Sequence, residues 1–175
     1  MKKNDFKKNG KGFMTILFLG VFMLSVSAVF AQNTNYSGSW TLNAGKSQIP
    51  DTGFRRGATK ITVTQDNLVL NTERLSKGRD GEDRVTKEKL TLDGKQCENV
   101  AFMDRIRKSV ATWSADGKVL TIKSSMTFDM NGESREMKST EIWKLSDDKS
   151  VLTIESVSDG RDGEVKSTLV YDVVK

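Results

Sequence analysis

Short runs of alternating apolar and polar residues, joined by tight polar turns, fill the C-terminal part of the chain. Four such runs follow one another, and they cover Lys118–Phe128, Ser134–Leu145, Val151–Ser158 and Glu164–Val174. A repeat of two residues places successive side chains on opposite faces of an extended strand, and short connectors suit hairpins. The pattern therefore predicts an antiparallel β meander.

The same pattern continues toward the N-terminus, where six further strands are expected. They cover Ser37–Asn43, Lys60–Gln65, Leu68–Ser76, Asp83–Leu92, Gln96–Met103 and Ile106–Ser114. The run Gln96–Met103 is weak by itself, but one more crossing is needed there for the strand directions to alternate. Ala44–Ala58 is expected to be a long loop, and Gln32–Tyr36 a mobile polar lead-in. An even number of strands lets the first and last pair antiparallel and abolishes both edges.

The expected fold is thus all-β, a single antiparallel up-and-down β-barrel of 8 to 10 strands. Because successive strands reverse direction, the turns alternate between the two ends of the barrel. One end is predicted to be apolar and closed by Trp40, Trp113 and Trp143, and the other carries turns of Gly, Asp, Arg, Glu and Lys.

Alternation also predicts which side chains point into the barrel. Several inward positions in the middle of strands carry hydroxyl or charged groups where a packed core would have Val or Leu, which favours a ligand cavity. The candidate ligand-binding residues are Arg74, Glu88, Ser124, Ser139, Glu141, Ser156, Ser167 and Tyr171. Two alternatives stay open: the charged members pair with one another, or a slip of one residue turns them outward.

The first 31 residues have a different character. A lysine-rich start precedes the apolar run Phe13–Val26, and Val29-Phe30-Ala31 offers the small residues of a cleavage site. The run is short for a membrane span of about 20 residues. We therefore expect residues 1–31 to be a signal peptide and residues 32–175 to be one exported domain, periplasmic or extracellular. A retained membrane anchor is the alternative.

Composition excludes several classes of function. Five of the 28 basic and one of the 23 acidic residues lie in the first 31, so the remaining 23 bases and 22 acids leave the domain a net charge of +1. Nucleic acid is therefore not an expected partner, since phosphate binding needs clustered Lys and Arg. Histidine is absent, which removes the usual zinc ligand and general base, and Cys97 is the single cysteine. No catalytic residue, metal or cofactor is expected.

The acid-rich turns Arg79–Asp83, Asp129–Glu133 and Asp159–Glu164 could in principle bind calcium through carboxylate and carbonyl oxygens. Asp-Gly and Asn-Gly pairs are themselves hairpin signals, so solvated turns are the better interpretation.

The motif Gly38-Ser39-Trp40 resembles the Gly-x-Trp motif of the lipocalin and fatty-acid-binding protein superfamily, which has calycin-type barrels. The longer opening Gly38–Ser47 resembles secreted bacterial lipocalin-like proteins. The resemblance implies that Gly38 and Trp40 are structural at the barrel base, with Lys144 or Lys166 as a basic partner for Trp40. The chain departs from the superfamily because no C-terminal helix, disulfide or helix pair after the first strand is evident.

The leading interpretation is an exported, monomeric lipocalin-like barrel that binds a small hydrophobic molecule or lipid in its interior and meets a membrane only through the signal segment before cleavage. The alternative is a ligand-free barrel that serves as a protein-interaction or envelope module through its polar mouth loops. A histidine-free isomerase or cyclase is a third hypothesis. An open interior pocket of about 300 Å³ or more would favour ligand binding.

Overall fold

A computed structural model describes residues 32–49, 57–78, 80–101, 104–130, 132–160 and 163–175. The chain divides into a unit of residues 1–30 and a unit of residues 31–175, and the description concerns the second. The expected signal segment and cleavage site lie outside the described residues. No stretch within these ranges forms a helix with the length and apolar character of a membrane crossing.

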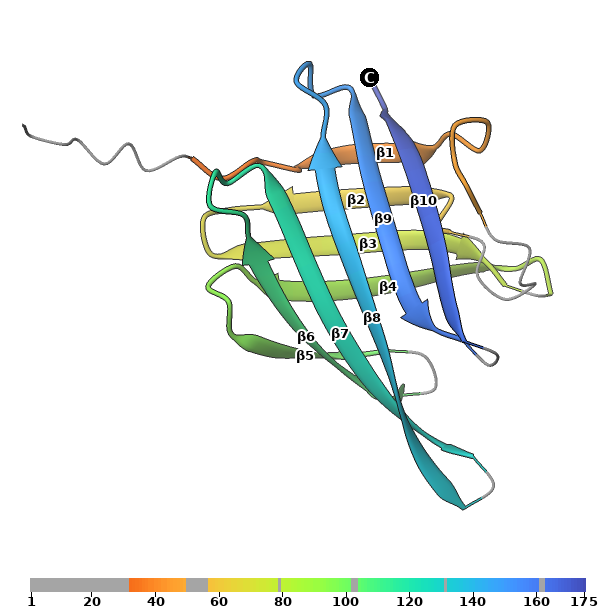
Figure 1. Cartoon of the computed structure of the whole chain (residues 1–175). Helices are drawn as coiled ribbons and strands as arrows, with labels where there is room; N and C mark the ends of the chain where they lie inside the picture. The colour runs from red at the N-terminus through yellow and green to blue at the C-terminus, as the bar shows by residue number, and fades with distance from the viewer. Residues whose placement is uncertain (1–31, 50–56, 79, 102–103, 131, 161–162) are drawn as a thin grey trace, which may run out of the picture. The chain divides into compact units, whose positions relative to one another are not determined.

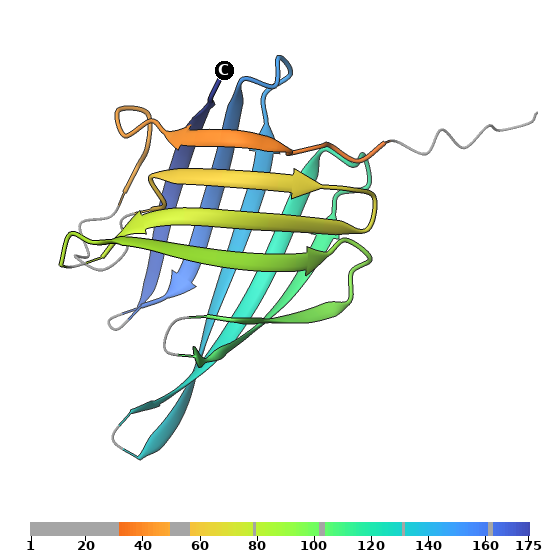
Figure 2. The same cartoon turned by 180° about the vertical axis from the view of Figure 1, so that it is seen from behind.

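Ten antiparallel strands make up the described part of the domain (Figures 1 and 2). They are β1 (Gly38–Leu42), β2 (Lys60–Gln65), β3 (Val69–Lys77), β4 (Asp83–Thr91), β5 (Gln96–Val100), β6 (Ile106–Trp113), β7 (Val119–Met130), β8 (Glu133–Leu145), β9 (Val151–Asp159) and β10 (Glu164–Val173). Each lies at the position predicted from the hydrophobic pattern, including the weak run that becomes β5. The up-and-down barrel is therefore confirmed.

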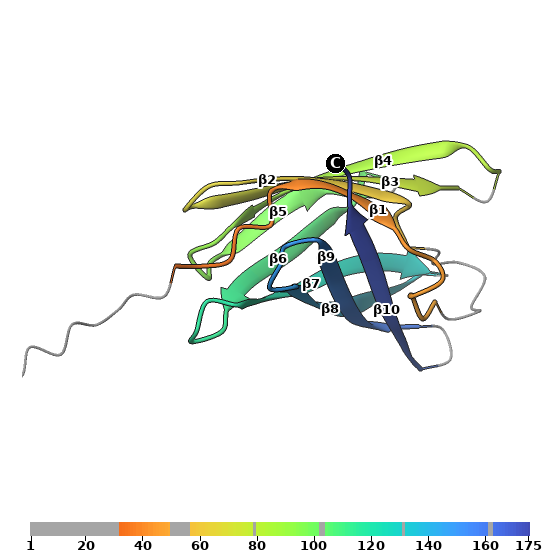
Figure 3. The ribbon, with the colours of Figure 1, turned by 90° about the horizontal axis from the view of Figure 1, so that it is seen from above.

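Neighbouring strands pair in the order β4-β3-β2-β1-β10-β9-β8-β7-β6-β5. The first and last strands pair as expected, with Trp40 opposite Val173 and Leu42 opposite Tyr171. Seen from above, β1–β4 lie over β6–β10 as two layers of a flattened barrel (Figure 3).

The barrel is nearly closed, and the expectation that both edges disappear was wrong. β4 and β5 are the two ends of the strand order and share no ladder of backbone hydrogen bonds. The turn after β4 contains Gly94 at φ 76°, and beyond it β5 pairs with β6 while it diverges from β4 (Figure 2). Where β5 faces β4, the Asn99 side-chain oxygen accepts from Lys89 N at 2.7 Å, and its amide donates to Lys89 O at 3.0 Å. One carboxamide thus replaces part of the missing ladder.

Tyr36 joins the tryptophans at the closed end of the barrel. Its ring stacks on Trp113 at 5.9 Å and meets Trp143 edge-on at 5.6 Å, and its carbonyl accepts from Trp40 Nε1 at 3.1 Å. The predicted cluster of three tryptophans at one end is therefore confirmed.

The prediction of a mobile lead-in at Gln32–Tyr36 was wrong. Tyr36 has no exposed surface, Thr34 N donates to Gly117 O at 2.8 Å, and the Gln65 side chain bonds both Tyr36 N and Thr34 O. The polar residues of this segment satisfy the backbone around a fully buried aromatic ring. The segment is therefore part of the closed end.

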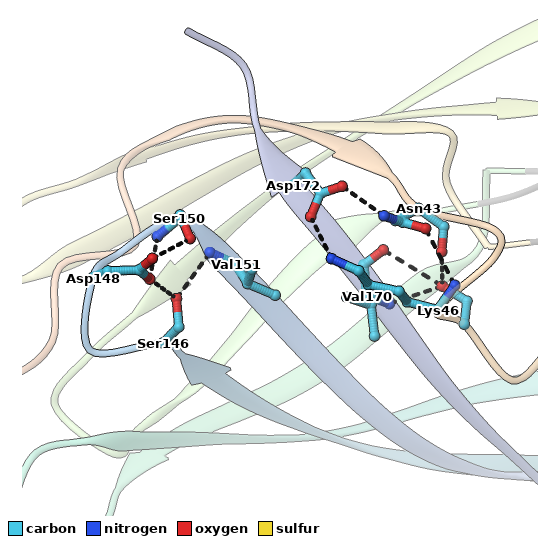
Figure 4. Close-up of polar contacts among 9 residues, drawn as sticks. Asn43, Lys46, Ser146, Asp148, Ser150, Val151, Val170 and Asp172 are labelled. Atoms are coloured by element: carbon cyan, nitrogen blue, oxygen red, sulfur yellow. Dashed lines mark hydrogen bonds and ion pairs between the residues drawn. The ribbon is translucent and has the colours of Figure 1, made fainter.

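The connection after β1 runs back along β10 rather than into a helix. Asn43 N donates to Val170 O at 2.8 Å, and Gln48 and Thr168 exchange backbone hydrogen bonds at 2.7 and 3.0 Å. Figure 4 shows the Asn43 amide bonded to Asp172 at 2.7 Å, beside the turn between β8 and β9. Residues 43–49 and 57–59, the described part of this connection, hold no helix. They cover the edge of β10 that the short β1 leaves free.

Candidate functional site

Serines on adjacent strands form a flat wall inside the barrel. Ser109, Ser124, Ser139 and Ser158 stand directly opposite one another on β6, β7, β8 and β9. Paired side chains on one face of a sheet lie close together, and the Ser109 and Ser124 hydroxyls are bonded at 2.9 Å. The next row toward the closed end pairs Ser156 with Ser167, whose hydroxyls are 2.7 Å apart. Ser109 and Ser158 are buried, whereas Ser124 and Ser139 in the middle of the row keep part of their surface accessible.

Arg74 and Glu141 form a two-pronged ion pair that crosses the barrel from β3 to β8. Arg74 Nη1 and Nη2 donate to the two Glu141 oxygens at 2.9 and 2.7 Å. Trp143 Nε1 donates to the same carboxylate at 2.9 Å, and the Arg74 guanidinium lies 5.5 Å from the centre of the Trp143 ring. A planar guanidinium held on both sides in this way has a fixed orientation.

A second ion pair continues the row. Arg107 on β6 donates to Glu88 on β4 at 2.7 Å, and the other Glu88 oxygen lies 4.0 Å from Arg74 Nε. Arg107, Glu88, Arg74 and Glu141 therefore alternate in sign across the interior, and we call these four residues the charge belt.

The contacts between Arg74 and Glu141 favour the charged forms of both groups. Burial by itself would raise the pKa of Glu141, but the positive charge of Arg74 and hydrogen bonds from Arg74 and Trp143 outweigh it and lower the pKa to about 2. Burial likewise opposes the charge of Arg74, and the carboxylates of Glu141 and Glu88 raise its pKa above the ordinary value. The belt is thus a set of two cations and two anions.

The belt lines open space although its side chains point inward. About 20% of the Arg74 side chain, 23% of Glu141 and 31% of Arg107 remain accessible, while Glu88 is 7% accessible. Toward the closed end the inward residues Leu120, Trp143 and Leu152 have no exposed surface. The interior is therefore packed at the tryptophan end, while three members of the charge belt keep accessible surface.

Tyr171 is an almost completely buried polar residue near the belt. It is 1% exposed, and its hydroxyl makes no hydrogen bond with another described residue. Burial is the main reason why the pKa of its phenol is raised above the usual value, so the group stays neutral.

All eight candidate residues occupy the inward register predicted by alternation. The structure brings Arg74, Glu88 and Glu141 together, and their mutual pairing was the alternative left open by the sequence. Arg107 and Ser109 were missed, although the alternation that places Trp113 inward also places them inward. Ser158 was expected on the inward face of its strand but was not among the candidate ligand-binding residues.

The expectations for the barrel base hold for Gly38 but not for the basic partner of Trp40. Gly38 has φ 150°, a backbone conformation that residues with a Cβ rarely adopt, while a Cβ there would meet the Trp40 ring at an ordinary contact distance of 3.5 Å. The basic partner suggested for Trp40 was wrong: Lys144 pairs with Glu155 on the outer face at 2.6 Å, and the Lys166 ammonium lies nearest Glu164. Adjacent inward residues force both lysines outward.

A groove of about 340 Å³ lies on the outside of the barrel beside the opening between β4 and β5. It is lined mainly by the outward-facing residues Thr62, Thr64, Asn71, Glu73, Lys87 and Lys89, together with Asn99 and the inward-facing Thr72 and Glu88. Because most of its lining faces outward, this groove is not the interior cavity that the sequence predicted, although Glu88 belongs to both the groove and the charge belt.

Within the described ranges, no group of three or more Cys, Asp or Glu side chains is placed to share a metal ion. Cys97 is a half-buried free thiol that bonds the Ser109 carbonyl at 3.4 Å.

Comparison with known proteins finds similar folds but no similar sequences. No protein-family model and no curated protein matches the sequence. Zebrafish ileal bile acid-binding protein, solved with cholic acid, superposes with a TM-score of 0.50 over 79% of this chain and 98% of that protein, at 14% identity. The fluorescent protein UnaG superposes with a TM-score of 0.48 over 79% and 96%, at 15% identity. The architecture is that of the calycin-type barrels of the fatty-acid-binding protein family.

Proposed function

We propose that this chain is an exported barrel that binds a small, largely apolar molecule in its interior. The carrying observation is that the inward-facing Arg74, Glu141 and Arg107 of the charge belt stay partly accessible, while the side chains toward the tryptophans are sealed. A solved barrel of the same fold holds cholic acid. Apolar surface buried in such a space contributes about 25 cal/mol per Å², and a few polar groups set the orientation.

The serine wall supplies a surface for such a molecule. Strands lie about 4.8 Å apart, so the row from Ser109 to Ser158 is about 14 Å wide and carries no bulky side chain. Hydroxyls along one side and aliphatic residues toward the floor suit an apolar molecule with one or two polar groups.

A dye that fluoresces in apolar surroundings, displaced by added lipids, tests interior binding. Ser124→Leu places a side chain in the proposed space and is expected to weaken dye binding at least tenfold. Ser125→Leu is the matched control, because the adjacent residue faces outward on the same strand. Equal affinity of the two variants would contradict interior binding and favour a barrel that acts through its mouth loops. Native mass spectrometry of protein from its own host, which identifies co-purified lipid and reports whether the protein is a monomer, is the complementary measurement.

Export rests on the N-terminal segment. We expect cleavage after Ala31, so that the mature chain begins at Gln32. Cell fractionation followed by mass measurement of the purified protein tests this, and a chain that keeps residues 1–31 would contradict it.

A further inference from the structure

We infer that the barrel selects a ligand whose buried polar group is uncharged, such as a hydroxyl, carbonyl or amide, over the same molecule with a carboxylate or an ammonium group. This inference rests on the proposed function and names the ligand chemistry of that site. It goes beyond the fold comparison, in which the zebrafish protein holds an acid.

The charge belt is already balanced. Both Nη groups of Arg74 donate to Glu141, and Arg107 donates to Glu88. An incoming carboxylate would have to displace Glu141 from Arg74 or remain beside it as a third anion against two cations. Either arrangement leaves a negative charge without its own partner, which is costly once the bound apolar molecule excludes water from the belt. An ammonium group would create the opposite imbalance.

Neutral hydrogen-bonding groups are present beside the belt. The hydroxyls of Ser139 and Ser158 on the serine wall, like that of Tyr171, make no hydrogen bond with another described residue. A hydroxyl can both donate and accept, so these groups match an alcohol, a ketone or an amide without a change in charge. Ser139 keeps accessible surface and can meet a neutral polar group directly, while Ser158 and Tyr171 are buried at 6% and 1% exposure. Both belt cations already have carboxylate partners, and Arg74 Nε is left as a buried donor that a neutral acceptor can satisfy.

Other arginines lie toward the mouth and have their own contacts. Arg84 pairs with Asp80 at 3.0 Å, Arg135 donates to Gly160 O, and Arg105 donates to Thr127 O and lies over the Phe128 ring. An acid bound with its carboxylate outermost would contact this region instead of the belt. The test must therefore distinguish the belt from the mouth.

Matched ligand pairs test the inference. Hexadecan-1-ol is compared with hexadecanoate and hexadecylammonium, and a steroid side-chain alcohol with the corresponding acid, all by dye displacement at neutral pH. The alcohols are expected to bind at least tenfold more tightly than their charged counterparts. An acid that binds as tightly as its alcohol overturns the inference while interior binding stands. If no member of either series displaces the dye, the proposed function itself fails.

Three variants change the belt charge in defined steps. Glu141→Gln makes the belt net positive and is expected to shift the acid-to-alcohol affinity ratio at least tenfold toward the acid. Arg74→Gln shifts the ratio away from the acid, and the double variant restores the wild-type ratio. The ratio compares two ligands on the same protein, so partial unfolding does not change it. A double variant that favours the acid as strongly as Glu141→Gln would overturn the inference.

Two control variants locate the effect. Glu155→Gln removes a carboxylate from the outer face of β9, where Glu155 pairs with Lys144, and is expected to leave the ratio unchanged. Arg105→Gln changes charge at the mouth and is expected to shift the ratio less than twofold. If Arg105→Gln shifted the ratio as much as Glu141→Gln does, the polar group of the ligand would be recognised at the mouth. That result would overturn the role of the belt.

Discussion

The phenol of Tyr36 donates a 2.8 Å hydrogen bond to the backbone carbonyl of Trp143, a residue 107 positions further along the chain. The same hydroxyl lies 3.1 Å from the Lys118 carbonyl. One side chain at the start of the described domain thus reaches the backbone of β8 and of the turn that leads into β7.

Tyr36→Phe is expected to destabilise the domain by about 1–3 kcal/mol, because a buried carbonyl loses its partner. Denaturant titration followed by tryptophan fluorescence measures this. Tyr171→Phe is the control, since that buried hydroxyl has no hydrogen bond to another described residue and its removal should cost less. Equal losses would show that the Tyr36 hydrogen bonds contribute little.

Alkaline stability should also depend on Tyr36. Burial raises the pKa of its phenol to about 12, against 10.0 for the ordinary group. The folded state therefore favours the neutral phenol, and this contribution is complete below about pH 10 and is lost as pH rises toward about 12. Unfolding free energies across this window should fall less steeply for Tyr36→Phe than for wild type. Identical slopes would contradict the assignment.

Glu141 gives the opposite dependence in acid. Its pKa is lowered from 4.5 to about 2, so its contribution is complete above about pH 4.5 and is lost as pH falls toward 2. Glu141→Gln should cost about 1–3 kcal/mol at neutral pH, less than a fully buried ion pair because the side chain is partly accessible. The variant should also show a flatter acid limb in denaturation at several pH values. Glu155→Gln, on the outer face, should behave like wild type.

Two turns with the same geometry predict opposite effects of substitution. In both, a serine hydroxyl donates to the aspartate two residues later and accepts from the valine amide five residues later. The first turn uses Ser114, Asp116 and Val119. The second uses Ser146, Asp148 and Val151, as Figure 4 shows. The fourth residue has positive φ, 67° at Gly117 and 56° at Lys149.

A left-handed conformation is strained for a residue with a Cβ, so Lys149→Gly should stabilise the domain by about 0.5–1 kcal/mol. Gly117→Ala should destabilise it by about 1 kcal/mol or more, because its Cβ would also lie 2.9 Å from the Asn33 side chain. Thermal unfolding measures both changes. A loss of stability in Lys149→Gly would contradict the strain argument.

Asn99→Ala tests the carboxamide that spans β4 and β5. The Lys89 amide loses its acceptor, so its hydrogen exchange should become at least tenfold faster. Amides between β7 and β8 should keep their protection. Unchanged exchange at Lys89 would show that the side chain does not hold the two strands together.

Alternation was sufficient to predict the faces of the strands and every strand except β5, which was expected because the strand directions must alternate. Because side chains alternate between the two faces of a strand, the face of every residue is fixed once one face is known to be buried. Ser124, Glu141 and Tyr171 could therefore be placed inward from sequence alone. The partners on other strands could not be predicted in the same way. The contact of Arg74 with Glu141 depends on how two layers face each other, which no local pattern encodes.

The missing ladder between β4 and β5 and the burial of Tyr36 were not predictable for a related reason. Backbone pairing leaves little trace in side-chain type, so the residues of β4 and β5 look like those of paired strands. Tyr36 follows a run of polar residues, and its only sequence signal was an aromatic ring immediately before the Gly38-Ser39-Trp40 motif.

The pairing of β1 with β10 also has a consequence for the order of folding. Trp40 needs Val173 as its neighbour, so a nascent chain cannot close the β1–β10 seam until β10 has left the ribosome. Contacts so distant in sequence form slowly. Until β10 is present, the edge of β1 that later pairs with it keeps its backbone hydrogen-bonding groups exposed. A chain without β10 would therefore leave one edge of β1 and one edge of β9 without a paired strand.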